Sequence, residues 1–202
     1  MIRVRIFVDH DNLSVAWKEL SDCRIDWRKL PKTICERLVL SEFVDAHMPV
    51  VKGVFVYASI HPQPNGGEAR FNDWLRFTLS QQPGYTVRLT ERRTIVQSCA
   101  KGHKIRQYIS KGVDTRMTCD LISFATRDTY DVGVLISGDA DLIPAVDFVQ
   151  ESLDRRIVHL GSEKTGQRLR STAWGHILLD DIAPELEIPW PANHVGESPD
   201  EN

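Results

Sequence analysis

Segments rich in β-branched residues alternate with segments of helical apolar periodicity along most of the chain, and this alternation restricts the fold more than any other feature. Strand-like composition marks residues 3–8, 50–60, 86–90, 132–137 and 156–160. Between them, apolar residues recur at helical spacing, most clearly at 30–39 and 117–125. Strands joined through helices pair in parallel. The sequence therefore predicts an α/β fold, a three-layer α/β/α domain with a central, mostly parallel sheet of five or more strands.

Size and composition suit one globular domain. The chain has 202 residues, of which 42% are hydrophobic and 26% charged, and this balance disfavours a disordered chain. No apolar run reaches the ~18–20 residues of a membrane span, and the first segment, MIRVRIFVDHDN, lacks the layout of a signal peptide. Four dispersed cysteines without CxxC spacing indicate reduced thiols. We therefore expect a cytoplasmic protein.

Residues 184–202 differ in composition from the rest of the chain. They hold four prolines and five acidic residues but no lysine or arginine. A segment of this kind cannot bury enough apolar surface to fold by itself. We therefore expect one domain over residues 1–183, followed by a disordered, acidic, proline-rich tail.

Charge is unevenly distributed along the chain. The net charge is −3, but residues 86–116 alone carry +6, which leaves −9 for the remainder. The eight basic residues of this segment are Arg88, Arg92, Arg93, Lys101, Lys104, Arg106, Lys111 and Arg116. Its central part, residues 90–112, has only weak periodicity and interrupts the strand–helix alternation.

Acidic residues follow two of the expected strands at their carboxyl ends. Asp9 ends the first strand, and Asp11 and Asn12 come just after it. Asp139 and Asp141 follow the fourth strand. In a doubly wound sheet these strands are neighbours where the strand order reverses. Converging carboxylates repel one another near pH 7 unless protons or cations are bound. Because oxygen ligands suit Mg²⁺ or Mn²⁺, the pattern predicts an acidic metal site.

Two further aspartates lie in the helical segment KGVDTRMTCDLISFA. Asp114 is expected to be the N-cap of a helix that begins near Thr115. Asp120 lies about 120° around the helix from it. Both border the apolar stripe that contains Met117 and Leu121, so both can reach a site at the edge of the sheet.

Simpler structural explanations compete for several of these acids. Asp114 and Asp141 suit helix N-caps. Asp120 suits a surface ion pair with Lys or Arg, and Asp11 suits a loop or a first helical turn. The convergence of the whole set at one sheet edge favours a metal site over these separate explanations.

Other functional signatures are absent from the sequence. It contains no phosphate-binding loop, no GxGxxG after a strand and no GxSxG elbow. Cys99 and His103 have no second pair of ligands at a suitable spacing, which disfavours a structural zinc site.

Three motifs in order resemble the NYN domain, and more closely its LabA-like branch within the PIN-like nuclease superfamily. They are hhhDxxN ending at Asn12, KGVDxxxxxD from Lys111 to Asp120, and YDxxxLISGDADLxP from Tyr130 to Pro144. The resemblance covers residues 3–181. One departure is Leu142, where Phe is common in the family.

The resemblance implies a PIN-like fold and a metal-dependent ribonuclease that hydrolyses RNA phosphodiester bonds. By motif, it places the Mg²⁺ or Mn²⁺ ligands at Asp9, Asp114, Asp139 and Asp141. It adds Asn12 and Asp120 to the catalytic set, as residues that orient ligands or a water.

The basic segment is expected to hold the RNA backbone through phosphate contacts, which would make affinity fall steeply with salt. The expected nucleic-acid-binding residues are Arg92, Arg93, Lys101, Lys104, Arg106 and Lys111. Lys111 precedes Asp114 closely and is placed to meet a phosphate near the metal.

Two other classes of function stay open at this point. One is a PIN-like scaffold that binds RNA or a protein without cleaving it. The other is a phosphatase of the haloacid dehalogenase type, which DHDNL and Ser59 resemble, although the spacing of the later acidic motif is too short. A two-fold homodimer is a further alternative, and DNA is an alternative substrate to RNA.

Overall fold

A single parallel sheet forms the centre of the molecule in the computed structural model, which describes residues 1–41, 43–44, 49–98 and 104–190. Its six strands lie in the order β4-β3-β1-β7-β8-β9, and every neighbouring pair is parallel. These strands are β1 (Arg3–Asp9), β3 (Val50–Ile60), β4 (Tyr85–Glu91), β7 (Val132–Ile136), β8 (Arg156–Gly161) and β9 (Gly175–Leu178). The order reverses between β1 and β7, as the sequence predicts.

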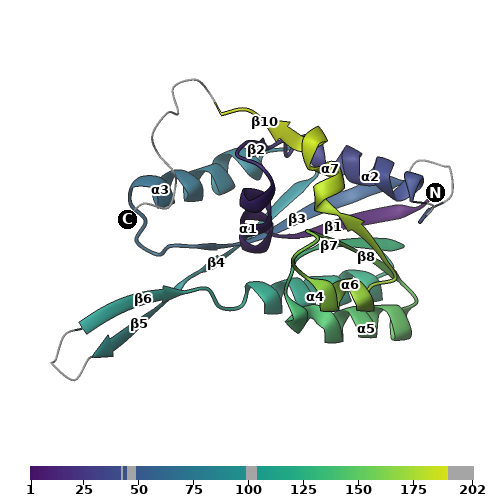
Figure 1. The fold of residues 1–202 in the computed structure, drawn as a ribbon. Helices are drawn as coiled ribbons and strands as arrows, with labels where there is room; N and C mark the ends of the chain where they lie inside the picture. Colours follow the sequence, from purple (N-terminus) through teal and green to yellow (C-terminus); the bar gives the residue numbers. More distant parts are fainter. Residues whose placement is uncertain (42, 45–48, 99–103, 191–202) are drawn as a thin grey trace.

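Helices cover both faces of this sheet (Figure 1). One layer contains α1 (His10–Leu20), α2 (Leu30–Leu40), α3 (Gly66–Asp73) with its π-helical continuation η1 (Trp74–Leu79), and α7 (Leu179–Leu186). The opposite layer contains α4 (Val113–Thr126), α5 (Ile143–Leu153) and α6 (Gln167–Thr172). The predicted three-layer α/β/α architecture is confirmed. No helix within the described ranges is long and apolar enough to cross a bilayer.

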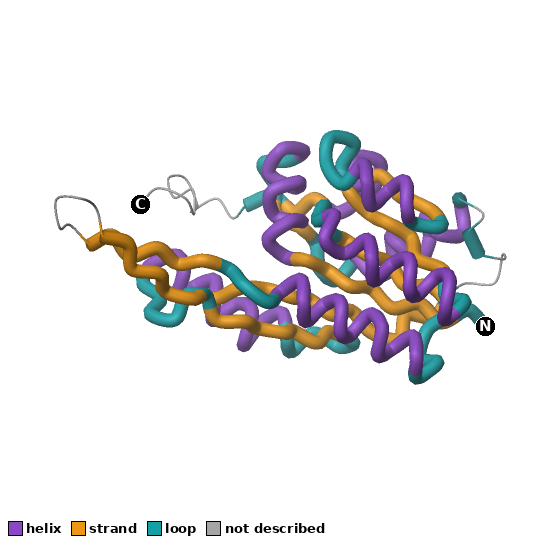
Figure 2. Tube along the Cα trace, turned by 90° about the horizontal axis from the view of Figure 1, so that it is seen from below, coloured by secondary structure: helices purple, strands orange, loops and turns teal. Residues whose placement is uncertain are grey.

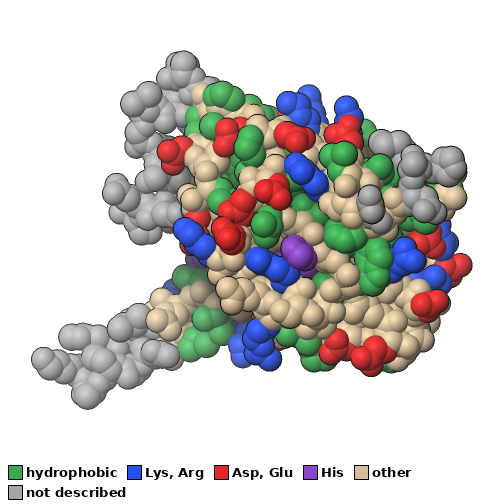
Figure 3. All heavy atoms as spheres, turned by 45° about the vertical axis from the view of Figure 1, so that its right-hand side comes forward, with side chains coloured by type: hydrophobic (Ala, Val, Ile, Leu, Met, Phe, Trp, Pro, Cys, Tyr) green, Lys and Arg blue, Asp and Glu red, His purple; other side chains and the backbone are tan. Residues whose placement is uncertain are grey.

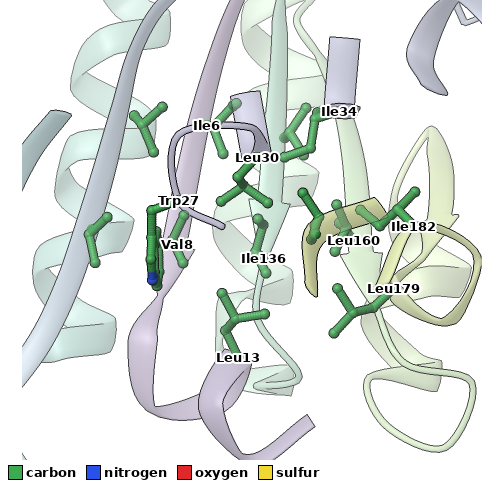
Figure 4. Packing of buried hydrophobic residues seen from close by; sticks show 14 of the residues in the cluster. Ile6, Val8, Leu13, Trp27, Leu30, Ile34, Ile136, Leu160, Leu179 and Ile182 are labelled. Carbon is green, nitrogen blue, oxygen red and sulfur yellow. The ribbon is translucent and has the colours of Figure 1, made fainter. Parts of the chain in front are cut away.

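Alternating strand residues divide the core into two clusters, one on each face of the sheet. Ile6 and Val8 pack with Leu13 of α1 and Leu30 of α2 (Figure 4). Phe7, which points to the other face, packs with residues of α4 and α5. Because helices cover both faces of the sheet, the consecutive residues Ile6, Phe7 and Val8 of β1 are all apolar and buried, and they alternate between the two clusters.

Some elements differ from the prediction. All five predicted strands are present, but β9 was not predicted because it is only four residues long and lies at the sheet edge. Residues 90–112, expected as an irregular insertion, contain β5 (Arg93–Ser98) and β6 (Lys104–Ile109), which pair as an antiparallel hairpin. This hairpin extends away from the body of the molecule (Figures 1 and 2).

The predicted boundary at residue 184 falls too early. Helix α7 continues to Leu186, and β10 (Glu187–Ile188) pairs with β2 (Arg24–Ile25). The indole of Trp190 donates a hydrogen bond to the carbonyl of Asp22 at 2.7 Å. Backbone pairing therefore extends the folded part despite its acidic composition, and residues 191–202 lie outside the described part.

A network of charged groups connects the start of β1 with the residues that precede β7. Both carboxylate oxygens of Asp131 accept hydrogen bonds from Arg3, at 2.6 and 2.7 Å for the shortest contacts. Asp128 accepts from Arg3 and from Arg155. These hydrogen bonds from Arg3 hold the pKa of Asp131 below its ordinary value. The network stabilises the amino-terminal ends of β1 and β7, whereas the predicted site lies at their carboxyl ends.

Replacing Asp131 with Asn should lower the free energy of unfolding by about 1–2 kcal/mol at pH 7, because charge-assisted hydrogen bonds are lost. The folded-state pKa lies below the unfolded value of about 3.9, so the contribution is present above pH 4 and is lost as pH falls. Urea unfolding of wild type and variant at several pH values measures this difference. A difference that stays constant from pH 7 to pH 2.5 would contradict the assignment.

Candidate metal centre

The carboxyl ends of β1 and β7 lie side by side, and they carry the first and last of the predicted acidic motifs. Val8 pairs with Ile136 in parallel register, so Asp9 lies opposite Ser137 at the next position. The hydroxyl of Ser137 donates to the carboxylate of Asp9 at 3.4 Å. Sheet pairing therefore brings together segments about 130 residues apart in the sequence.

Three carboxylates gather at this edge. One oxygen each of Asp114, Asp139 and Asp141 lies within 4.8 Å of the other two. Asp114 and Asp139 are half-buried, and Asp141 is exposed. Side chains at this separation repel one another in the ionised form, and a divalent cation between them would remove that repulsion.

The SGD turn after β7 fixes the position of Asp139. Its carboxylate accepts the backbone N–H of Asp141 at 2.9 Å and caps the short 3₁₀ helix η2 (Ala140–Leu142). Its own N–H donates to the hydroxyl of Ser137 at 3.1 Å. Asp141 lies within η2, so the alternative in which it caps a helix is wrong: Asp139 holds that position.

Asp114 reaches the cluster from the first turn of α4. The helix begins at Val113, and its N-cap is Gly112, which has a φ of 89°. The prediction that Asp114 caps a helix near Thr115 is therefore wrong. Glycine adopts this left-handed conformation without steric cost, and the helix consequently starts early enough to place Asp114 inside its first turn. A carboxylate is favoured there by the helix dipole.

Asp9 lies deeper than the three clustered carboxylates and is not one of them. It is 5% exposed and caps α1, accepting hydrogen bonds from the backbone and side-chain amides of Asn12 at 3.1 and 2.7 Å. Burial raises its pKa above the ordinary value, although the hydrogen bonds from Asn12 oppose that shift. Through Ser137, Asp9 is connected to the turn that carries Asp139.

Asn12 joins the two strand ends. Its amide nitrogen donates to Asp9, and its carbonyl oxygen accepts the backbone N–H of Gly138 at 3.3 Å. The side chain is therefore engaged in both directions and holds the SGD turn against β1. This arrangement suits a residue that orients ligands rather than one that reacts.

Asp120 contacts other partners. It accepts a hydrogen bond from the hydroxyl of Tyr57 at 2.9 Å and lies 3.3 Å from the guanidinium of Arg88. It is not one of the three clustered carboxylates. The ion pair with an arginine is the alternative that the sequence left open for this residue. Tyr57 lies beside Asp9 in the sheet register, so Asp120 borders the site indirectly.

A second polar cluster surrounds the base of the hairpin. The hydroxyl of Ser59 donates to Asp11 at 2.8 Å, and Arg92 donates to Ser59 at 3.2 Å and to Glu68 at 3.3 Å. Burial raises the pKa of Asp11, but hydrogen bonding to His10 and Ser59 and the charge of Arg92 lower it by more. Asp11 and Arg92 therefore share the hydroxyl of Ser59 as a hydrogen-bond partner.

The remaining predicted RNA contacts differ in their environment. Arg93 and Arg106 are exposed on the hairpin, and Lys111 is exposed just before α4. Within the described residues, none of these three forms an ion pair with a carboxylate. Lys101 and the Cys99–His103 pair lie outside the described residues, as does the side chain of Lys104. Lys and Arg side chains are visible on the body of the molecule beside the hairpin (Figure 3).

Sequence reasoning missed two residues of the site region. Ser137 connects Asp9 with Asp139, and the motif SGDAD contains it without revealing that bond. His159 lies behind the turn, where its imidazole contacts the carbonyl of Ser137 at 2.8 Å. The signal for His159 was a single polar residue inside the apolar strand RIVHLG.

The fold and the acidic edge define a PIN-like α/β/α domain. A family model described as the NYN domain matches residues 3–180, and the chain belongs to this family. NYN domains are a PIN-like nuclease family. A crystal structure of a protein of unknown function from Vibrio parahaemolyticus RIMD 2210633 is similar, with a TM-score of 0.61 and 19% identity over 93% of this chain and 96% of that chain. That likeness concerns the fold alone. No curated protein matches the chain.

The residues present fit a hard divalent cation. All three members of the cluster offer carboxylate oxygens, and neither His nor Cys is among them. This donor set suits Mg²⁺ or Mn²⁺ and disfavours zinc.

Proposed function

We propose that this protein is a metal-dependent ribonuclease that hydrolyses RNA phosphodiester bonds at the edge formed by β1, β7 and α4. The observation that carries the proposal is the approach of Asp114, Asp139 and Asp141 to within 4.8 Å in a domain of the NYN family. Nucleases of this family act on RNA in general. Among the described residues, Cys23, Cys35 and Cys119 are free thiols, which agrees with a cytoplasmic location.

Asp114, Asp139 and Asp141 would hold the ion directly. When bound, Mg²⁺ or Mn²⁺ supplies activation of a water and neutralises charge that develops on the phosphodiester. Asp9 accepts the hydrogen of the Ser137 hydroxyl, which leaves the oxygen of that hydroxyl to accept the N–H of Asp139. Asn12 keeps Asp9 and the turn together. Asp120 fixes Tyr57 beside them. These residues provide preorganisation, which lowers the cost of assembling the reactive geometry.

We assign the RNA backbone contacts to the exposed cations Arg93, Arg106 and Lys111. Arg92 is a weaker candidate because Glu68 and Ser59 already occupy its guanidinium. The aromatic ring of Tyr108 packs against His61 with 3.9 Å between ring centroids, so it supports the hairpin base. A scaffold that binds RNA without cleaving it would retain these same contacts, and only the fate of the RNA separates the two functions.

Replacing Asp139 with Asn should lower metal-dependent cleavage of labelled single-stranded RNA by at least about 100-fold, since a charged ligand of the metal is removed. The assay compares Mn²⁺, Mg²⁺ and EDTA. Asp154→Asn is the matched control, because Asp154 is exposed at the end of α5 and Asn also adopts its left-handed conformation.

Cleavage that is equal in the Asp139→Asn protein would identify a contaminating nuclease and contradict the proposal. RNA binding that survives EDTA, without cleavage under any metal, would instead favour the scaffold.

The double variant Arg93→Ala, Arg106→Ala should weaken binding of single-stranded RNA and make it less salt-dependent. Each lost phosphate contact reduces the slope of log K against log salt by about 0.7 for single strands, so the slope should fall by about 1.4. Fluorescence anisotropy in EDTA, between 50 and 300 mM salt, measures binding without cleavage. Arg127→Ala is the control, since Arg127 is exposed at the far end of α4. An unchanged slope would remove the hairpin from the RNA interface.

A further inference from the structure

His159 is a polar residue placed in the interior of the sheet. It is 0% exposed, and its neighbours Ile157, Val158 and Leu160 in β8 are equally buried hydrophobic residues. A buried imidazole costs free energy unless its nitrogen atoms find partners. Its presence in an otherwise apolar strand therefore requires a compensating interaction.

One nitrogen of His159 has such an interaction, and the other has none. Nε2 lies 2.8 Å from the carbonyl oxygen of Ser137. A carbonyl oxygen only accepts, so Nε2 carries the hydrogen and a neutral ring leaves Nδ1 bare. Nδ1 is buried and has no hydrogen-bond partner among the described residues. Burial accordingly lowers the pKa of His159, while the bond to Ser137 opposes that shift.

Two glycines make room for the imidazole ring. A Cβ at Gly161 would lie 2.6 Å from Cε1 of His159, and one at Gly166 would lie 2.9 Å from its Nε2. The same atom at Gly166 would be 3.3 Å from the Cα of Gly138. The loop between β8 and α6 therefore packs against both the imidazole ring of His159 and the SGD turn.

The carbonyl that His159 contacts belongs to the residue on which the turn depends. The hydroxyl of Ser137 receives the N–H of Asp139 and donates to Asp9. The carbonyl of Ser137 and the N–H of Gly138 belong to one planar peptide unit. A hydrogen bond that fixes this carbonyl therefore also fixes the direction of the Gly138 N–H, which donates to Asn12. His159 thus acts on the turn from the core side, and Asn12 acts on it from β1.

We propose that His159 is a positioning residue that holds the Ser137–Asp139 turn, and with it Asp139, in the geometry of the metal centre. Its effect on metal binding rests on the proposed function above. Its effect on the turn depends only on the hydrogen bond and the packing.

Two variants of equal length separate the hydrogen bond from the packing. In His159→Gln the side-chain amide nitrogen is the same number of bonds from the backbone as Nε2, and it can still donate to Ser137. His159→Met has similar length without a donor. Tyr130→Phe is the control, because it removes another buried hydrogen bond to a carbonyl, that of Leu121, remote from the turn.

The first measurement is amide hydrogen exchange over residues 137–142, made without metal at a temperature where all variants are folded. Exchange at Gly138 and Asp139 should be about tenfold faster in His159→Met, because one hydrogen bond is lost. It should stay near wild type in His159→Gln and Tyr130→Phe. Equal exchange in His159→Met and wild type would overturn the proposal. Equal acceleration in Tyr130→Phe would also overturn it, because the effect would then be general destabilisation.

The second measurement is the affinity for Mn²⁺ alone, by calorimetry or electron paramagnetic resonance. His159→Met should bind Mn²⁺ about 10- to 100-fold more weakly, the usual effect of removing a partner behind a metal ligand, and His159→Gln should recover most of that loss. Unchanged affinity in His159→Met would contradict the proposal. If wild type binds no Mn²⁺, the metal centre itself fails, and the exchange result alone decides whether His159 positions the turn.

Discussion

Parallel pairing of β1 with β7 is the contact on which the rest of this structure depends. Val4 pairs with Val132 and Val8 with Ile136, although more than 120 residues separate the members of each pair. The pairing sets the point where strand order reverses, and it aligns Asp9 with Ser137. It is reinforced at the opposite end by the hydrogen bonds between Arg3 and Asp131. A change of register by one residue would turn every side chain of β1 to the opposite face and would separate the acidic motifs.

The acidic residues at this edge have different tasks, and their hydrogen bonds distinguish them. Asp9 and Asp139 each cap a helical segment, which fixes their side chains without a metal. Asp114 has no capping bond and points into the cluster from a helix whose start is set by Gly112. Asp120 is committed to Tyr57 and Arg88. The acidic residues at this site are therefore positioned mostly by backbone, amide and hydroxyl donors.

The hairpin of β5 and β6 extends from the same edge of the sheet. An isolated two-stranded hairpin is marginally stable in water, so contacts at its base matter for its orientation. The ring of His61 packs against Tyr108, and Arg92 is held by Ser59 and Glu68. These contacts connect the hairpin to the carboxyl ends of β3 and β4, on the same side of the sheet as the acidic cluster. Basic residues that are adjacent in sequence, such as Arg92 and Arg93, consequently differ in whether their charge is already neutralised.

Local patterns in the sequence determined the fold class of this protein and the location of its candidate site. Apolar strands, helical periodicity and the order of the acidic motifs identified the three layers, five central strands and the edge where the carboxylates gather, because these features depend on side-chain period and on residues near one another in the chain. The tertiary structure decided what depends on partners distant in sequence. It placed Asp120 against Arg88 and removed it from the cluster, paired β10 with β2 beyond the expected end of the domain, and set His159 behind Ser137. No local pattern encodes these contacts, because the free energy of a buried polar group is set by the atoms that folding brings to it.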